Sequence, residues 1–339
     1  MKDTDRRQSS RKIILTAAIL FSLAIALIVP FVGMKTIGLR SLLYPSPGSS
    51  EPFIFWNIRI PRLLASFTAG AALAISGMTF QAMFRNPLAT PFTLGVASGA
   101  SLGAALYVRL GLSFSLFGVS GLSLFAFLGA ILSIGLVYGL SRMKRSFPTA
   151  TMLLAGVAVS FLFSSLILFI QYISGFIHSF RIVRWLMGSL ENIGYQSVFE
   201  MLPFVVSGAF MVLLLGRELN LLLTGEEIAH SRGVDVKAVK KTLFFATSLM
   251  VGGVVAICGP IGFVGMMVPH ICRLIVGADH RWLAPMILLF GGAFLAICDT
   301  LSRTLIAPAE IPVGVITALL GAPFFLWLLL RGESEKGLL

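Results

Sequence analysis

Long apolar stretches separated by short polar segments run through the chain from residue 13 to residue 330. A helix crosses a bilayer in about 20 apolar residues, whereas the strands of a membrane barrel alternate in polarity over about ten residues. The chain lacks such alternation, so the pattern predicts an all-α, polytopic membrane protein. Ten apolar blocks lie at residues 13–32, 62–84, 93–108, 118–141, 150–173, 198–216, 242–258, 261–276, 283–304 and 312–330.

The positions of lysine and arginine predict the orientation of these helices, because cytoplasmic loops carry an excess of both residues. With a cytoplasmic N-terminus, the inner segments hold more than twice as many of them as the outer segments. We therefore expect about ten transmembrane helices with both termini in the cytoplasm, forming a single transmembrane domain over residues 1–339. The first block exceeds a signal-peptide core and is interpreted as an uncleaved helix. The outer loop at 174–197 is amphipathic and predicts a short interfacial helix.

The segment Arg217–Lys241 is the longest strongly polar stretch between two apolar blocks, and this orientation places it in the cytoplasm. Thr224 and Glu227 have the spacing of a capping box, which predicts that a helix of two turns begins there. Gly233 suits the left-handed residue that ends such a helix, and Asp235 is placed to cap the next one. From this pattern alone, an ordinary solvated loop and a docking element for a partner both remain open.

The composition agrees with a membrane location. Hydrophobic residues make up 57% of the chain and charged residues 12%, against about 25% charged residues in soluble domains. The net charge of +12 is interpreted as cationic cytoplasmic loops, because no basic patch is interleaved with aromatic residues that could bind nucleic acid. Cys258, Cys272 and Cys298 lie in apolar blocks without a CxxC pair and indicate buried thiols. No Walker A motif for binding ATP occurs.

Few ionisable residues lie within the apolar blocks, where they are functional candidates. Asp299 and Arg303 have the i, i+4 spacing of a helical salt bridge at the outer end of the ninth block. Arg59 and Arg62 stand at the outer end of the second block, and Pro61 between them favours an extended entry into that helix. With Arg303 they form a set of three outward arginines suited to carboxylates on an extracytoplasmic partner. The alternative is simple snorkelling at the membrane interface.

Four motifs of the chain resemble signatures of the FecCD-type permeases, the membrane subunits of type II ABC importers for iron–siderophore complexes, haem and vitamin B12. The resemblance covers about residues 13–331. The motifs are RIPRLLASFTAGAALAISGMTFQAMFRNPLATPFTLGVASGASLGA (59–104), TGEEIAHSRGVD (224–235), GPIGFVGMMVPHICRLIVGADHRWLAP (259–285) and AEIPVGVITALLGAPFFLWLL (309–329).

The resemblance implies a multi-pass permease of the bacterial inner membrane, surrounded by lipid, that forms a homodimer. Two cytoplasmic ATPase subunits and one extracytoplasmic substrate-binding protein would be its partners, with no role for nucleic acid. The chain would be no enzyme and would bind no metal or cofactor, since ATP and Mg²⁺ would belong to the ATPase subunit.

The resemblance also implies roles for individual residues. Arg59, Arg62 and Arg303 would face glutamates of the binding protein. Thr149 and Ala150 match the cytoplasmic gate at the start of the fifth helix, although Ala150 replaces a hydroxyl residue of the vitamin B12 relative. The family's coupling helix, which contacts the ATPase, matches Gly225, Glu226, Glu227, Ala229, His230, Arg232 and Gly233.

The expected function is ATP-driven import of a metal chelate by alternating access, with an iron(III)–siderophore favoured over vitamin B12 and haem. An ion-coupled secondary transporter is the alternative. Such transporters place carboxylates at the middle of the membrane, where these blocks have none, Asp299 being the nearest. No constellation of catalytic residues supports a membrane-embedded enzyme.

Overall fold

Helices follow the predicted apolar blocks in order along the chain. The computed structural model describes residues 2–44, 49–116, 118–142, 149–191 and 193–331. Seven helical stretches in this described part are long and apolar enough to cross a membrane. The other three block-forming helices are shorter, so the number of spans stays a prediction. The ten are α1 (Lys2–Ile28), α4 (Ile60–Phe84), α5 (Val96–Arg109), α6 (Gly121–Arg142), α7 (Thr149–Tyr172), α9 (Tyr195–Leu214), α12 (Val236–Cys258), α13 (Val264–Val276), α14 (His280–Thr304) and α15 (Val313–Arg331).

Short elements connect these helices. The amphipathic loop forms a helix, α8, which confirms the short helix predicted there, while its place at the membrane interface stays a prediction. One antiparallel pair of two-residue strands joins α5 to α6, with Ser115 opposite Ser120. The short elements are η1 (Val29–Phe31), α2 (Leu39–Leu43), α3 (Glu51–Ile54), the π-helical turn η2 (Phe55–Arg59), β1 (Ser115–Leu116), β2 (Val119–Ser120), α8 (Phe176–Leu186), α10 (Gly216–Thr224) and α11 (Glu226–Ser231).

The expected extended entry at Pro61 is wrong, because residues 51–84 are helical throughout. Pro61 lies in the first turn of α4, directly after the π-helical turn. Proline has no N–H to donate to the preceding turn, and a π-turn is one way in which a helix absorbs such an interruption. The continuous helix places Arg59 and Arg62 one turn apart near its outer part.

Helix α4 forms the centre of the core, and glycines set how closely its neighbours approach. A Cβ atom added to Gly77 would lie 1.7 Å from the carbonyl oxygen of Gly265 in α13. A Cβ atom on Gly70 would lie 2.2 Å from the carbonyl oxygen of Gly291 in α14. The small residues noted in these blocks therefore allow backbone-to-backbone packing between helices, as expected in lipid.

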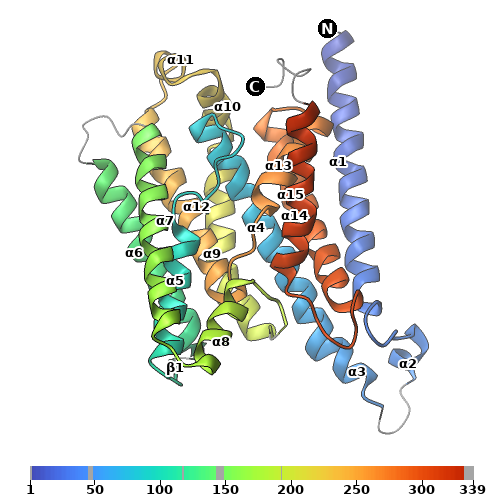
Figure 1. The fold of residues 1–339 in the computed structure, drawn as a ribbon. Helices are drawn as coiled ribbons and strands as arrows, with labels where there is room; N and C mark the ends of the chain where they lie inside the picture. Colours follow the sequence, from blue (N-terminus) through green and yellow to red (C-terminus); the bar gives the residue numbers. More distant parts are fainter. Residues whose placement is uncertain (1, 45–48, 117, 143–148, 192, 332–339) are drawn as a thin grey trace.

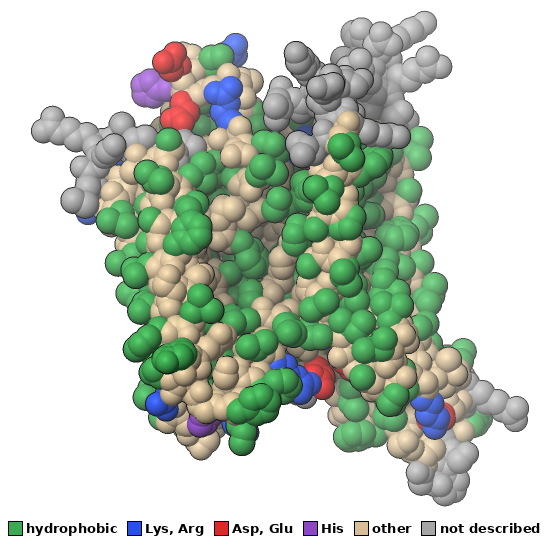
Figure 2. Space-filling model, in the orientation of Figure 1, with side chains coloured by type: hydrophobic (Ala, Val, Ile, Leu, Met, Phe, Trp, Pro, Cys, Tyr) green, Lys and Arg blue, Asp and Glu red, His purple; other side chains and the backbone are tan. Residues whose placement is uncertain are grey.

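The short connecting helices lie at the two ends of the bundle (Figure 1). Helices α10 and α11 lie at the same end as the start of α1 and the end of α15, whereas α2, α3 and α8 lie at the opposite end. Charged side chains gather at these ends, and an apolar band lies between them (Figure 2). The arrangement agrees with the predicted orientation, in which the polar segment and both termini share one side of the membrane.

Candidate functional site

The polar segment Arg217–Lys241 folds as three helical pieces with two sharp corners. After α11, Gly233 has a φ of 85° and its N–H donates to the carbonyl of His230 (2.9 Å), while the N–H of Val234 donates to that of Ala229 (3.1 Å). These paired bonds are the Schellman arrangement that ends a helix at glycine. Asp235 accepts a hydrogen bond from the backbone N–H three residues on (3.0 Å) and caps α12. The predicted glycine corner and aspartate cap are confirmed.

The predicted capping box at the start of α11 is wrong. Thr224 is the last residue of the preceding helix α10, and its hydroxyl donates to the carbonyl of Leu221 (2.7 Å). Gly225, with a φ of 129°, occupies the cap position of α11, where no side chain caps the helix. Glycine tolerates this backbone conformation, so the boundary between α10 and α11 lies at Gly225. Thr224 therefore belongs to α10 and does not cap α11. The sequence reasoning missed α10 altogether.

Helix α11 has a buried and an exposed side. Ala229 is fully buried and packs with Leu222 and Val234, so it holds the helix in place and presents nothing to a partner. Ile228 is exposed and adds an apolar contact to this outer side, a signal that the sequence reasoning passed over. Of the residues predicted to contact an ATPase, those with exposed side chains are Glu226, Glu227, His230 and Arg232.

Glu226 ties α11 to the first turns of α12. Its carboxylate contacts the ammonium group of Lys240, and Lys240 is only 3% exposed although Glu226 is about half exposed. An ammonium group that is buried needs such a partner. Glu226 is therefore partly structural, and at this residue the segment is more than an ordinary solvated loop.

A second polar anchor joins α10 to α14 and α1. The amide of Asn220 donates to Asp279 (2.8 Å), which also caps α14 through the N–H of Arg281 and lies 3.6 Å from Arg11. Partial burial of the carboxyl opposes its ionisation, but the hydrogen bonds from Asn220 and Arg281 outweigh it and hold the pKa of Asp279 below its ordinary value. The segment that carries α11 is thus fixed on both sides.

A cavity of about 750 Å³ lies beside α11, between the ends of α4, α10 and α13. Arg273 donates to the side-chain oxygen of Gln81 (2.9 Å) in its wall. Its lining residues are Gln81, Met83, Phe84, Arg85, Asn86, Pro87, Leu223, Thr224, Glu226, Arg273 and Ala278.

The residues matched to the gate lie at the start of α7. Helix α7 begins at Thr149, and Ala150 is exposed. The side chain of Thr149 and residues 143–148 lie outside the described part of the structure. The gate assignment stays a prediction.

At the opposite end, the three arginines are buried and do not project outward as expected. Arg59, Arg62 and Arg303 are 6%, 4% and 9% exposed. Arg59 donates to the carbonyl oxygens of Pro30 (2.8 Å) and Lys35. Desolvated guanidinium groups require such acceptors, and the folded connection between α1 and α4 supplies them here.

Arg62 is the centre of a network of ion pairs. Its Nε donates to both oxygens of Asp299 (2.8 and 3.0 Å), and its Nη1 donates to Glu310 (2.8 Å). The expected pair between Asp299 and Arg303 is confirmed, at 3.3 Å. The tighter partner of Asp299, however, lies 237 residues earlier in the sequence. The network joins α4, α14 and the connection to α15.

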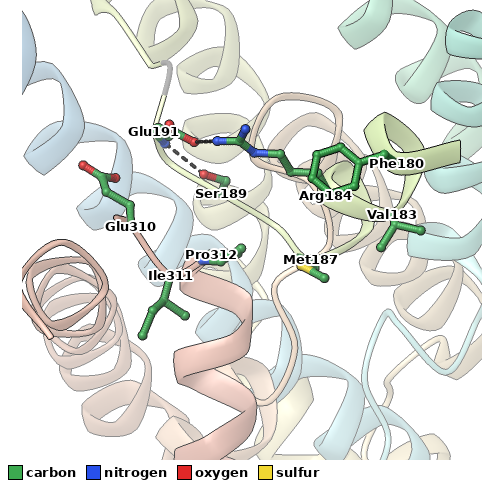
Figure 3. Close-up of a pocket in the computed structure, with 9 residues that line it drawn as sticks. All are labelled: Phe180, Val183, Arg184, Met187, Ser189, Glu191, Glu310, Ile311 and Pro312. Atoms are coloured by element: carbon green, nitrogen blue, oxygen red, sulfur yellow. Dashed lines mark hydrogen bonds and ion pairs between the residues drawn. The ribbon is translucent and has the colours of Figure 1, made fainter. Parts of the chain in front are cut away.

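Beside this network is a pocket of about 260 Å³ (Figure 3). Glu310 stands at its edge, and a second ion pair between Arg184 and Glu191 (2.5 Å) lies on another wall. The remaining lining residues are Phe180, Val183, Met187, Ser189, Ile311 and Pro312.

The described residues contain no group of three or more His, Cys, Asp and Glu side chains that could hold a metal ion. Cys258, Cys272 and Cys298 are free thiols and are buried, as the apolar surroundings in the sequence indicated.

Comparisons with known proteins agree on one kind of protein. The profile of the FecCD transport family matches residues 14–331. The chain is 39% identical to the hemin transport system permease protein HmuU of Yersinia pestis, over 90% of this chain and 91% of that protein. It is 45% identical to the cobalamin import system permease protein BtuC of Halobacterium salinarum, over 81% of this chain and 73% of that protein. A solved structure described as an inward-facing metal-chelate type ABC transporter has a TM-score of 0.84 at 33% identity, covering 94% of this chain and 99% of that one.

Proposed function

The chain belongs to the FecCD transport family, and we propose that it carries an iron(III)–siderophore complex across the membrane by alternating access. It is a permease subunit of an ABC importer of the metal-chelate, haem and vitamin B12 type, located in the bacterial inner membrane. It is a transport subunit, and ATP hydrolysis belongs to a separate ATPase subunit. The permease itself needs no cofactor in this proposal, because ATP and Mg²⁺ act on the ATPase.

One observation carries the coupling part of this proposal. Helix α11 has an inner side fixed by Ala229 and by the Glu226–Lys240 pair, and an outer side formed by exposed residues such as Glu227 and Arg232. A short helix held in this way moves together with α12 when the ATPase displaces it, instead of bending. We assign the outer side of α11 to the ATPase, one ATPase subunit for each copy of the permease.

We propose that two copies of the chain form the working permease. We assign the contact between the two copies to α7 and α15, whose exposed large apolar side chains include Phe161, Phe169 and Leu326. The substrate-binding protein would dock at the end that carries Arg59, Arg62 and Arg303.

Uptake by proteoliposomes tests the proposal. Vesicles that contain the permease and its ATPase should take up a labelled chelate from the binding protein only when ATP is present on the side of the membrane that carries the ATPase. Uptake that survives removal of the ATPase but collapses with an ionophore would instead establish the ion-coupled secondary transporter.

The cargo is tested separately by competition. An excess of unlabelled ferric siderophore should abolish delivery from the binding protein, whereas cobalamin and hemin should leave it unchanged. Competition by hemin or cobalamin alone would refute the siderophore assignment and leave the ATP-driven import intact.

A further inference from the structure

We propose that Glu310 is an internal stand-in for a carboxylate of the substrate-binding protein, and that docking displaces it from Arg62. The starting point is the burial of the three arginines. Arg62 is almost closed to a partner, because it is buried and its Nε and Nη1 already donate to Asp299 and Glu310. A docking carboxylate must therefore replace one of them.

The two carboxylates differ in how easily they can leave. Asp299 is on α14, has a 2% exposed side chain, and contacts both Arg62 and Arg303. Glu310 is on the connection between α14 and α15, contacts Arg62 through one oxygen, and has a 32% exposed side chain. The Arg62–Asp299 pair is buried on both sides and is costly to break, whereas the Arg62–Glu310 pair is open to solvent on the Glu310 side and costs less to separate. Glu310 is the exchangeable ligand.

The backbone around Glu310 allows this exchange without refolding. The next residue, Ile311, is held by two hydrogen bonds to Ser302, one from its N–H (3.0 Å) and one to its carbonyl (2.6 Å). Rotation of the Glu310 side chain alone therefore releases Arg62. The adjoining 260 Å³ pocket offers space for an incoming acidic side chain (Figure 3).

Charge favours an acidic partner at this position after the exchange. Three guanidinium groups lie together here. Arg59 and Arg303 both approach Gly33, since a Cβ atom added to that glycine would lie 2.8 Å from Arg59 and 3.4 Å from Arg303. Arg62 joins them because it shares Asp299 with Arg303. With Glu310 turned away, only Asp299 of the network's carboxylates remains. An incoming carboxylate restores the balance and gains the charge-assisted hydrogen bond that Glu310 gave up.

Affinity measurements in nanodiscs test the exchange, with the purified binding protein of the same transport system as the probe. Glu310→Gln should tighten binding about two- to fivefold, because a weak internal competitor is removed. Glu310→Asp, which keeps the charge but shortens the reach to Arg62, should give a smaller gain. Glu200→Gln is the matched control, since it removes the same charge from α9, outside both the pocket and the Arg62 network, and should leave affinity unchanged.

The outcomes separate this exchange from the proposed function on which it rests. If wild-type permease does not bind the binding protein, the docking role falls and the exchange falls with it. If the wild type binds, but Glu310→Gln and Glu310→Asp bind no tighter than Glu200→Gln, the exchange alone is refuted. Weaker binding by well-folded Glu310→Gln protein also refutes it, because Glu310 would then be a direct contact.

Discussion

Reversing the charge of Glu226 should damage the permease in a way that reversing its neighbour Glu227 does not. Both side chains are exposed on α11, but only Glu226 contacts a buried partner, Lys240. Glu226→Lys removes the counter-charge of a buried ammonium group and places a second ammonium group beside it. Glu227→Lys changes only a solvated surface. The pair therefore separates the anchoring of α11 from the docking of an ATPase.

The structure sets the expected difference in stability between the two variants. Two opposite charges about 4 Å apart near a protein surface interact by about 4 kcal/mol. Because Glu226 is about half exposed, solvent screens part of this energy, and we expect a loss of about 1–3 kcal/mol for Glu226→Lys. Surface substitutions such as Glu227→Lys stay within about 0.5 kcal/mol. The first variant should melt about 1–4 °C lower, and the second should match the wild type.

Thermal melting in nanodiscs and capture of the ATPase, measured side by side, are the assays. Both variants should capture less ATPase, but only Glu226→Lys should melt early. The swap Glu226→Lys with Lys240→Glu should recover most of the melting temperature. Equal melting of Glu226→Lys and Glu227→Lys would refute the anchoring argument, and normal capture by Glu227→Lys would refute the docking role of this side of α11.

Three further substitutions test other parts of the structure. Gly77→Ala should cost about 1–3 kcal/mol or more, because the new methyl group meets the α13 backbone. Gly135→Ala, with nothing within 4 Å, should not lower the melting temperature in the same assay, because alanine is the better residue in a helix interior. Asp279→Asn should flatten the acid dependence of the melting temperature, because the pKa of Asp279 is lowered in the folded protein. The ionised carboxylate therefore stabilises the fold above the ordinary carboxyl pKa of about 4, and this stabilisation is lost as the pH falls through the lower folded pKa. Asp299→Asn should cost about 3–5 kcal/mol because it leaves buried guanidinium groups without their shared carboxylate; a melting temperature no lower than that of Glu310→Gln would contradict this ranking.

Features set by neighbouring residues could be predicted from the sequence. The apolar blocks gave the order of the helices, since each helix must present apolar side chains over its length in lipid. Gly233 and Asp235 marked a helix end and a helix start because the bonds they make span only a few residues. The capping box failed for a local reason as well. Gly225 could take the cap position that the pattern assigned to Thr224.

Features set by distant residues could not be predicted. Asp299 and Arg303 are visible as a pair at i, i+4, but nothing in the sequence shows that Arg62 approaches Asp299 more closely. Burial of the arginines depends on the same long-range packing. The sequence contains the arginines and the carboxylates, and only the packing of α4 against α14 determines which of them meet.

The placement of Asp299 also bears on where the energy for transport enters. A carboxylate that carries a coupling ion must offer oxygen atoms to that ion within the membrane. Both oxygens of Asp299 are held by Arg62, and one of them also lies 3.3 Å from Arg303. Asp299 was the nearest candidate for such a role, and in this arrangement it serves as a fixed counter-ion that locks two helices together. This pairing supports the proposal that energy enters through α11, which is anchored to α12 on one side and exposed on the other.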